Sequence, residues 1–328
     1  KEYHIDGFRF DLMGIHDVET MKAIRKALNA IDPTIYILGE GWTAGKAQLP
    51  DSLLAMKKNV YQMPGVAAFS DEFRDGLRGP FGDDAKGGFI VGRPHFEADV
   101  RYGIVGGISH PQLTGDSIAS SVAVWANSPM QFISYVSCHD DLCLFDRFRK
   151  TVPGASVKEL YAWQKLAETA VLTSQGVPFI YSGDEILRSK FGVANSYNSG
   201  DSINAINWGL KTIHREVFDY IRGLIAMRKA HPAFRLGSPD LIRKHLEFIH
   251  VPATNVVAFR LKGKPCGDSW LNTIVVLNAR TEPIKVDIPD GKYWIACRDG
   301  KIDLVLGLGT LQGNQTVVAP MSAMIIHQ

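Results

Sequence analysis

An arginine and a carboxylate stand two residues apart in a strand-like segment near the start of the sequence. The segment reads GFRFDLMG at residues 7–14 and contains Arg9 and Asp11. Side chains of a strand point alternately to opposite faces, so we expect both charged groups on one face and the two phenylalanines on the other, toward covering helices. The Arg9 guanidinium would favour the charged form of the Asp11 carboxyl, which suits a nucleophile beside its cation.

Two more groups of acids follow apolar, strand-like runs. Glu40 lies in GEGW at residues 39–42, after a run of β-branched and aromatic residues. Asp140 lies in SCHDD at residues 137–141, after another apolar run, and His139 precedes it. The carboxyl ends of the strands of an α/β barrel meet at one face. Three such ends that carry acids predict an acid-based active site there.

Each pattern alone has a simpler interpretation. An arginine and an aspartate two apart on a strand are more often a plain ion pair, GEGW also suits a turn with a buried aromatic, and His139 with Asp140 also suits a helix cap. Their occurrence in this order, each at a strand end and at the spacing of a βα repeat, favours the catalytic interpretation.

These runs resemble three short sequence regions of the α-amylase superfamily, glycoside hydrolase family 13, and GFRFDLMG with GEGW is most similar to its type I pullulanase branch. The run GVPFIYSGDE at residues 176–185 resembles the last barrel strand of that family. The run NSYNSGDSIN at residues 195–204 resembles a loop typical of pullulanases. The resemblance covers essentially the whole chain, most loosely at its two flanks and between residues 45 and 125.

The resemblance implies a retaining glycosidase, which needs an ionised carboxylate and a protonated acid roughly 5 Å apart across the scissile bond. It gives Asp11 the role of nucleophile and Glu40 that of the acid that protonates the leaving oxygen and later activates water. Asp140 would stabilise the oxocarbenium-like transition state. The expected substrate is an α-glucan such as pullulan or a branched starch-like glucan, and the preference for α-1,6 linkages rests on the resemblance alone.

The resemblance also implies a set of substrate-binding residues. Trp42 is expected to form a sugar platform, although a core position suits a tryptophan equally well. Asp141 replaces the asparagine usual in the family, and Ser137 with Cys138 replaces a more common Glu-Ser, which bears on substrate contacts more than on the chemistry. Two of the residues lie in the loop after the last strand, where a turn-forming role also accounts for them. The predicted set is Arg9, His139, Trp42, Asp141, Asn198 and Asp201.

The fold expected is a (β/α)8 TIM barrel of which only about strands 4–8 are present, followed by an all-β antiparallel sandwich. Strand-like and helix-like segments alternate through residues 1–234, the pattern of βα units. Residues 235–328 show short apolar runs of period two, with a turn expected at residues 289–291. About five strand candidates precede residue 234, where a closed barrel needs eight. The first strand would then have a bare edge, covered by a missing N-terminal barrel half or by self-association.

Composition and charge exclude some partners. The 328 residues are 45% hydrophobic and carry a net charge of +2 without a clustered basic run, which argues against nucleic acid and membrane surfaces. A neutral glucan is the expected partner. The four cysteines are sparse and are expected to be reduced, and the compartment is not predicted.

No cofactor is expected to be required. No His-x-x-x-His metal pattern occurs, so no metal-ligating residues are predicted. Several members of the family hold calcium through oxygen ligands, and Asp83 with Asp84, or Asp71 with Glu72, would suit that ion.

Two alternatives stay open. A glucan-branching or transglycosylating enzyme of the same superfamily would share all three acids. A glucan-binding chain without catalysis would result if the missing front of the barrel carried essential contacts.

Overall fold

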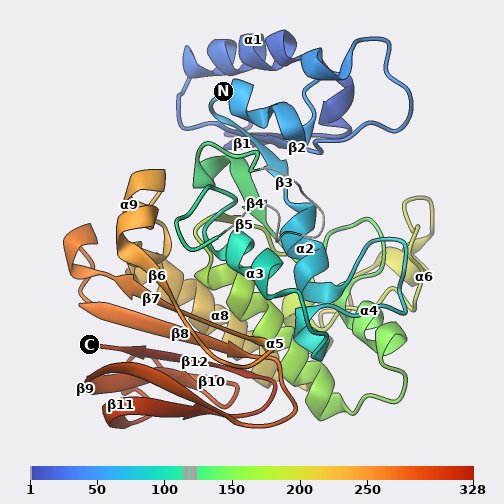
Figure 1. The fold of residues 1–328 in the computed structure, drawn as a ribbon. Helices are drawn as coiled ribbons and strands as arrows, with labels where there is room; N and C mark the ends of the chain where they lie inside the picture. Colours follow the sequence, from blue (N-terminus) through green and yellow to red (C-terminus); the bar gives the residue numbers. More distant parts are fainter. Residues whose placement is uncertain (1, 114–117, 119–123) are drawn as a thin grey trace.

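The computed structural model describes residues 2–113, 118 and 124–328. Within these residues, a parallel sheet of five strands opens the chain (Figure 1). Each strand pairs with the next one along the sequence, as in a (β/α) barrel, so the predicted partial barrel is confirmed. The strands are β1 (Gly7–Phe10), β2 (Tyr36–Gly39), β3 (Val66–Phe69), β4 (Phe132–Ser134) and β5 (Val177–Pro178).

Helices follow four of these five strands, and apolar helix residues such as Val18 and Phe73 pack in one cluster with strand residues such as Ala68. Helix α1 begins behind Asp17, whose carboxylate accepts a hydrogen bond from the Thr20 amide, and α5 begins with a capping box formed by Ser156 and Glu159. No helix in the described ranges has both the length and the apolar character needed to span a bilayer. The helices are α1 (Val18–Asn29), α2 (Asp71–Arg78), α3 (Glu97–Ile104), α4 (Leu144–Thr151), α5 (Val157–Thr173), α6 (Asp201–Asn204), α7 (Leu210–Ile213), α8 (Arg215–Ala230) and α9 (Pro239–His245).

The inner face of the parallel sheet is only partly covered. Phe69, Ile133 and Tyr135 form a small buried cluster there, with partly buried neighbours that include Phe179. Strand β1 pairs with β2 and lies at the edge of the sheet, which confirms the predicted bare edge. Phe8, which we expected to face covering helices, is 39% exposed because β1 extends away from the body of the molecule (Figure 1).

The C-terminal part is antiparallel, as predicted. Its strands form one hydrogen-bonded sheet in the order β10-β9-β12-β8-β7-β6, and β11 pairs with β9. Strands β9 and β11 fold beneath β8 and β12 (Figure 1), and a second apolar cluster contains residues of all four strands. The strands are β6 (Leu246–Ile249), β7 (Val256–Lys262), β8 (Asn272–Asn278), β9 (Ile284–Arg298), β10 (Lys301–Ile302), β11 (Thr310–Val318) and β12 (Ser322–His327).

One predicted turn is wrong. The sequence Pro289-Asp290-Gly291 lies inside β9, because that strand pairs with β11 on both sides of it. Gly313 of β11 pairs with Gly291, and Gln315 pairs with Asp287, so residues 288–290 of β9 form a bulge at this register shift. The pairing of the two strands continues on both sides of the bulge.

The barrel part and the β-domain share one core. A single apolar cluster contains Leu166 of α5 and Leu224 of α8 together with Leu277 of β8 and Ile325 of β12. The predicted domain boundary after residue 234 falls at the end of the 3₁₀ helix Pro232–Phe234. Because packing is continuous across this point, the boundary stays a prediction.

Candidate active site

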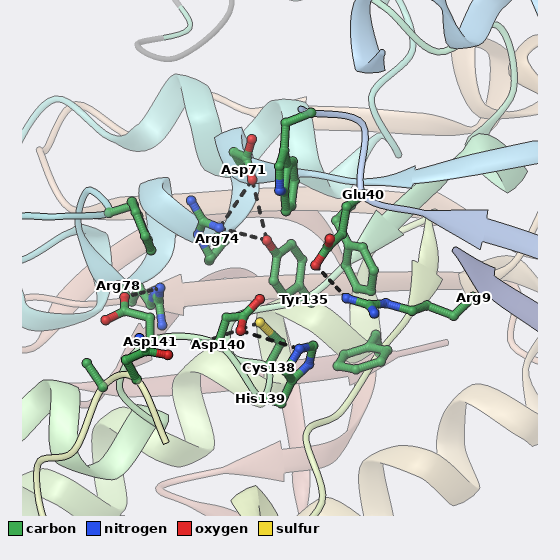
Figure 2. A pocket seen from close by; sticks show the side chains of 16 residues that line it. Arg9, Glu40, Asp71, Arg74, Arg78, Tyr135, Cys138, His139, Asp140 and Asp141 are labelled. Atoms are coloured by element: carbon green, nitrogen blue, oxygen red, sulfur yellow. Dashed lines mark hydrogen bonds and ion pairs between the residues drawn. The ribbon is translucent and has the colours of Figure 1, made fainter. Parts of the chain in front are cut away.

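The carboxyl ends of the parallel strands surround a pocket of about 730 Å³ (Figure 2). Six residues predicted from the sequence line it: Arg9, Glu40, Trp42, His139, Asp140 and Asp141. The rule that the carboxyl ends of parallel strands meet at one face, called the strand-end rule below, therefore located most of the candidate site.

Glu40 is held at both carboxylate oxygens. Its side chain is buried, and Oε1 accepts a hydrogen bond of 2.5 Å from Nη2 of Arg9. The backbone amide of Leu12 donates to Oε2 at 2.8 Å. Leu12 lies just after β1 in the left-handed region, with φ of 45°. The GFRFDLMG and GEGW segments are thus joined directly, and a buried carboxylate has the partners it requires.

Asp11 lies beside this pair at the rim of the site. Nη1 of Arg9 contacts Oδ1 of Asp11 at 2.7 Å, so one guanidinium binds the carboxylates of Asp11 and Glu40 together. The Asp11 side chain is 71% exposed, and Asp11 does not line the pocket. This position follows from the bare edge of β1, since Asp11 comes directly after that strand.

Three chemically active side chains meet within the pocket. The ligand-type atoms of Glu40, His139 and Asp140 all lie within 4.8 Å of one another. Nε2 of His139 is 3.4 Å from Oδ1 of Asp140 (Figure 2). These atoms are of types that bind metals. However, Arg9 already forms an ion pair with Glu40, and its positive charge opposes the binding of a cation there.

Asp141 is turned toward the protein. Its φ of 65° is left-handed, a conformation that aspartate adopts more readily than most residues. Its carboxylate pairs with Nη2 of Arg78 at 2.8 Å, and both side chains are nearly buried. Nζ of the buried Lys190 donates to the carbonyl oxygens of His139 and Asp141, each at 2.9 Å. Arg78 and Lys190 therefore fix the turn that presents His139 and Asp140.

We expect Lys190→Met to lower the free energy of unfolding by about 1–3 kcal/mol, because it removes the donor from two partly buried hydrogen bonds that hold the turn. Urea unfolding followed by circular dichroism measures the loss. Lys58→Met is the matched control, since Lys58 is 55% exposed and its ion pair with Asp51 lies at the surface. Equal stability of the two variants would show that Lys190 does not hold the turn.

Sequence reasoning missed the wall opposite Arg9. Nη1 of Arg74 donates to the hydroxyl of Tyr135 at 2.9 Å, and that hydroxyl donates to Oδ1 of Asp71 at 3.4 Å (Figure 2). Burial raises the pKa of Tyr135 well above its usual value, so the phenol stays neutral. Phe69 packs edge-on against Tyr135 and Phe179 at 5.0 and 5.3 Å. Asp71 comes two residues after β3, so the strand-end rule contained the signal.

The structure does not bring Asn198 and Asp201 into the pocket. Both are exposed, and Asp201 begins α6. Asn195, from the same run, does line the pocket. The loop leaves the site after that residue, because the Asn204 amide fastens it by donating to the carbonyl oxygens of Ser196 and Ser199.

The carboxylates expected to suit calcium have cationic partners. Asp84 pairs with Arg147 and Lys150, and Asp83 pairs with Lys86. Nζ of Lys57 forms ion pairs with Oδ2 of Asp71 at 3.0 Å and with Oε1 of Glu72 at 2.8 Å. Calcium binding at these positions stays a prediction. All four cysteines are free thiols.

Comparison with known proteins points to one family. Residues 242–301 match a family model described as "Pullulanase, all-beta domain". A curated pullulanase of Bacillus subtilis is 36% identical over 298 residues, which are 90% of this chain and 40% of that protein. This chain thus spans about two fifths of the length of that relative.

Solved structures agree over the whole chain. The pullulanase from Bacillus acidopullulyticus superposes with a TM-score of 0.91 at 36% identity, covering 100% of this chain and 38% of that one. A pullulanase from Paenibacillus barengoltzii in complex with maltohexaose and alpha-cyclodextrin gives 0.87 at 39% identity, covering 100% and 48%. The resemblance to the type I pullulanases of glycoside hydrolase family 13 is therefore confirmed, and the chain corresponds to the C-terminal part of such proteins.

Proposed function

We propose that this chain carries the acids of a retaining α-glucan hydrolase that debranches pullulan-type substrates at α-1,6 linkages. One observation carries the proposal: the Arg9 guanidinium binds the carboxylates of both Asp11 and Glu40 at the mouth of the pocket. Asp140 lines the same pocket. A retaining mechanism requires two such neighbouring carboxyl groups.

In the proposed first step, an oxygen of Asp11 attacks the anomeric carbon of the glucan. The bond from that carbon to the glycosidic oxygen breaks, and Glu40 gives its proton to the departing oxygen. In the second step, Glu40 takes a proton from water, whose oxygen bonds to the anomeric carbon and releases Asp11. Both carboxyl groups end the cycle in their starting protonation states.

Arg9 supports both roles in this scheme. Glu40 accepts hydrogen bonds at both oxygens in the free protein, so it must release one of them before it can hold and donate a proton. Arg9 contacts Asp11 through its other nitrogen, Nη1. A shift of the guanidinium toward Asp11 would free Oε1 of Glu40 and would favour the charged nucleophile at the same time.

Asp140 and His139 are proposed to stabilise the charge that develops on the sugar ring, since their side chains are about half exposed within the pocket. Trp42 is proposed as the sugar platform because it lines the same pocket. Asp141 is proposed to orient this turn through Arg78. A contact of Asn198 or Asp201 with substrate would require a different position of their loop.

The relatives support the proposed class of substrate, whereas the proposed α-1,6 linkage rests on the family resemblance. The Paenibacillus barengoltzii pullulanase was solved with maltohexaose and alpha-cyclodextrin, and another of its structures is complexed with maltotriose. We propose α-glucans of this kind as substrates here, with calcium an optional structural ion.

The open edge of β1 is proposed to need a partner. Tyr3, Ile5 and Phe8 are exposed at or near this edge by 85%, 50% and 39%. Unpaired strand edges with apolar side chains invite further strand pairing. We propose that strands supplied by the N-terminal half of a longer protein cover this edge, and self-association of the chain is the competing arrangement.

Digestion of pullulan tests the proposed function. We expect new reducing ends with maltotriose as the product. A branching or transglycosylating enzyme would redistribute chain lengths without new reducing ends, whereas a chain that only binds glucan would be retarded by pullulan in native electrophoresis and would release no sugar. Either of these results would overturn the proposal of debranching by this chain.

A further inference from the structure

A second pocket, of about 310 Å³, lies on the β-domain. Trp270, Trp294 and His327 line it together with the loop of residues 303–307, and it shares no lining residue with the first pocket. Its volume is at the small end of the range for ligand sites, enough for one or two sugar rings.

A stack of aromatic rings forms one side of this pocket. The Trp270 ring lies between those of His231 and His327, with centroid distances of 3.5 and 3.9 Å. The Trp294 ring continues the series at 6.0 Å from His327 and within 20° of parallel. Asp268 fixes the far end of the stack by binding Nδ1 of His231 at 2.8 Å. The rings are therefore held in position before any ligand arrives.

Strand geometry places Trp294 at the open end of the stack. Trp294 and His327 are cross-strand partners in β9 and β12. Tyr293 and Ile295, on either side of Trp294 in the sequence, are buried, so Trp294 points to the outer face, where it is 45% exposed. Lys292, two residues earlier in β9, has its Nζ 5.5 Å from the Trp294 ring centre.

Polar groups stand beside the rings. Oδ1 of Asp303 accepts hydrogen bonds from the amides of Val305 and Leu306 at 2.9 and 3.0 Å, which shapes the loop. These backbone bonds lower the pKa of Asp303, so its carboxylate is an acceptor at neutral pH. Burial, together with the charge of His231, lowers the pKa of His327 to about 4. The His327 ring is therefore uncharged at neutral pH.

We propose that this pocket is a second carbohydrate site, which holds one or two glucose rings of an α-glucan chain against the exposed Trp294 ring, with Trp270, whose two faces are covered by His231 and His327, lining the pocket beside them. A pyranose has an apolar face of C–H groups and an edge of hydroxyl groups, so it needs an aromatic surface with hydrogen-bonding groups at its border. Asp303 and Lys292 supply an acceptor and a donor. The ionised Asp303 disfavours phosphate-bearing ligands. The choice of an α-glucan among sugars rests on the proposed function.

The indole N–H signals of the chain test this site separately from the first pocket. The sequence has six tryptophans, and Trp294→Phe identifies the signal of Trp294 in a ¹H–¹⁵N spectrum. On addition of millimolar maltotriose, we expect the Trp294 signal to shift. Trp294→Ala should weaken binding, followed at the Trp270 signal, by about fivefold and leave the titration of Trp42 unchanged.

Trp208→Ala is the matched control, because Trp208 is 60% exposed and lines neither pocket. A Trp294 signal that stays in place while Trp42 responds would overturn the second site and leave the proposed active site intact. A Trp294 signal that moves while Trp42 does not would support the second site and count against the first. Equal shifts of Trp294 with cellotriose, which has β-linkages, would overturn the preference for α-glucans.

Discussion

Glu40→Gln is expected to lower the rate of pullulan hydrolysis by about 10²- to 10⁴-fold, the usual contribution of a general acid-base group. Glutamine preserves the shape of the side chain and can still accept from the Leu12 amide, but it cannot donate a proton to a leaving oxygen. The affinity for maltotriose should change little, since Glu40 acts on the scissile bond. Initial rates of reducing-sugar release, with binding measured separately, distinguish the two effects.

Asp71→Asn provides the matched control for that prediction. Asp71 lines the same pocket and is also held by an arginine, but it lies on the opposite wall, next to Tyr135. We expect its loss to change substrate affinity more than the chemical step. A Glu40→Gln variant with a rate near that of the unaltered chain would exclude Glu40 as the acid and would leave the site without a buried carboxyl group in that role.

Raising the pH is expected to destabilise the fold through two buried acids behind the site. Glu168 of α5 and Asp184 of the 3₁₀ helix Asp184–Ile186 are 0% and 2% exposed. Burial, and then the charge of neighbouring acids, raises the pKa of both groups, that of Asp184 to about 8. In the unfolded chain both would titrate near pH 4, so between about pH 4 and pH 8 the folded state binds more protons.

The sign of the effect follows from this proton excess. The free energy of unfolding falls as the pH rises through that window, by at most about 1.4 kcal/mol per pH unit for each proton. Glu168→Gln removes one titrating group and keeps the shape of the side chain. We therefore expect this variant to be more stable than the unaltered chain near pH 8 and to lose less stability between pH 5 and pH 8, as measured by urea unfolding.

Glu19→Gln is the control for the titration, because Glu19 is exposed on α1 and pairs with Lys22 at the surface. It should leave the pH profile unchanged. If the Glu168→Gln variant lost stability with rising pH as steeply as the unaltered chain, Glu168 would already be ionised in the folded state, and the buried-acid account would be wrong.

The sequence predicted those parts of the site that depend on local rules. Arg9, Glu40 and Asp140 could be located because parallel strands end at one edge of a sheet, whatever the intervening helices contain. Asp71 obeys the same rule, but its strand lies in the stretch between residues 45 and 125, where the family resemblance is loosest. Tyr135 was hidden within an apolar run, since alternation alone does not tell a pocket wall from a core.

Other features depended on distant contacts. The turn expected at residues 289–291 is wrong because β11 pairs with β9 on both sides of it, which outweighs the local preference of proline and glycine. Asn198 was expected at the pocket because of its loop, but contacts made by Asn204 direct that loop outward. Exposure of Asp11 at the rim follows from the unpaired edge of β1, and the count of five strands did indicate that edge.

The central claim is that Asp11 is the nucleophile, and covalent trapping tests it most directly. A 5-fluoro-α-glucosyl fluoride loses its anomeric fluoride when a carboxylate attacks that carbon, and the resulting sugar ester can be located by peptide mass spectrometry. We predict a single added sugar on the peptide that contains Asp11, and none in Asp11→Asn. Because the Asp11 side chain is 71% exposed, that variant should fold normally. A sugar ester on Glu40 or Asp140, or undiminished pullulan hydrolysis by Asp11→Asn, would contradict the account.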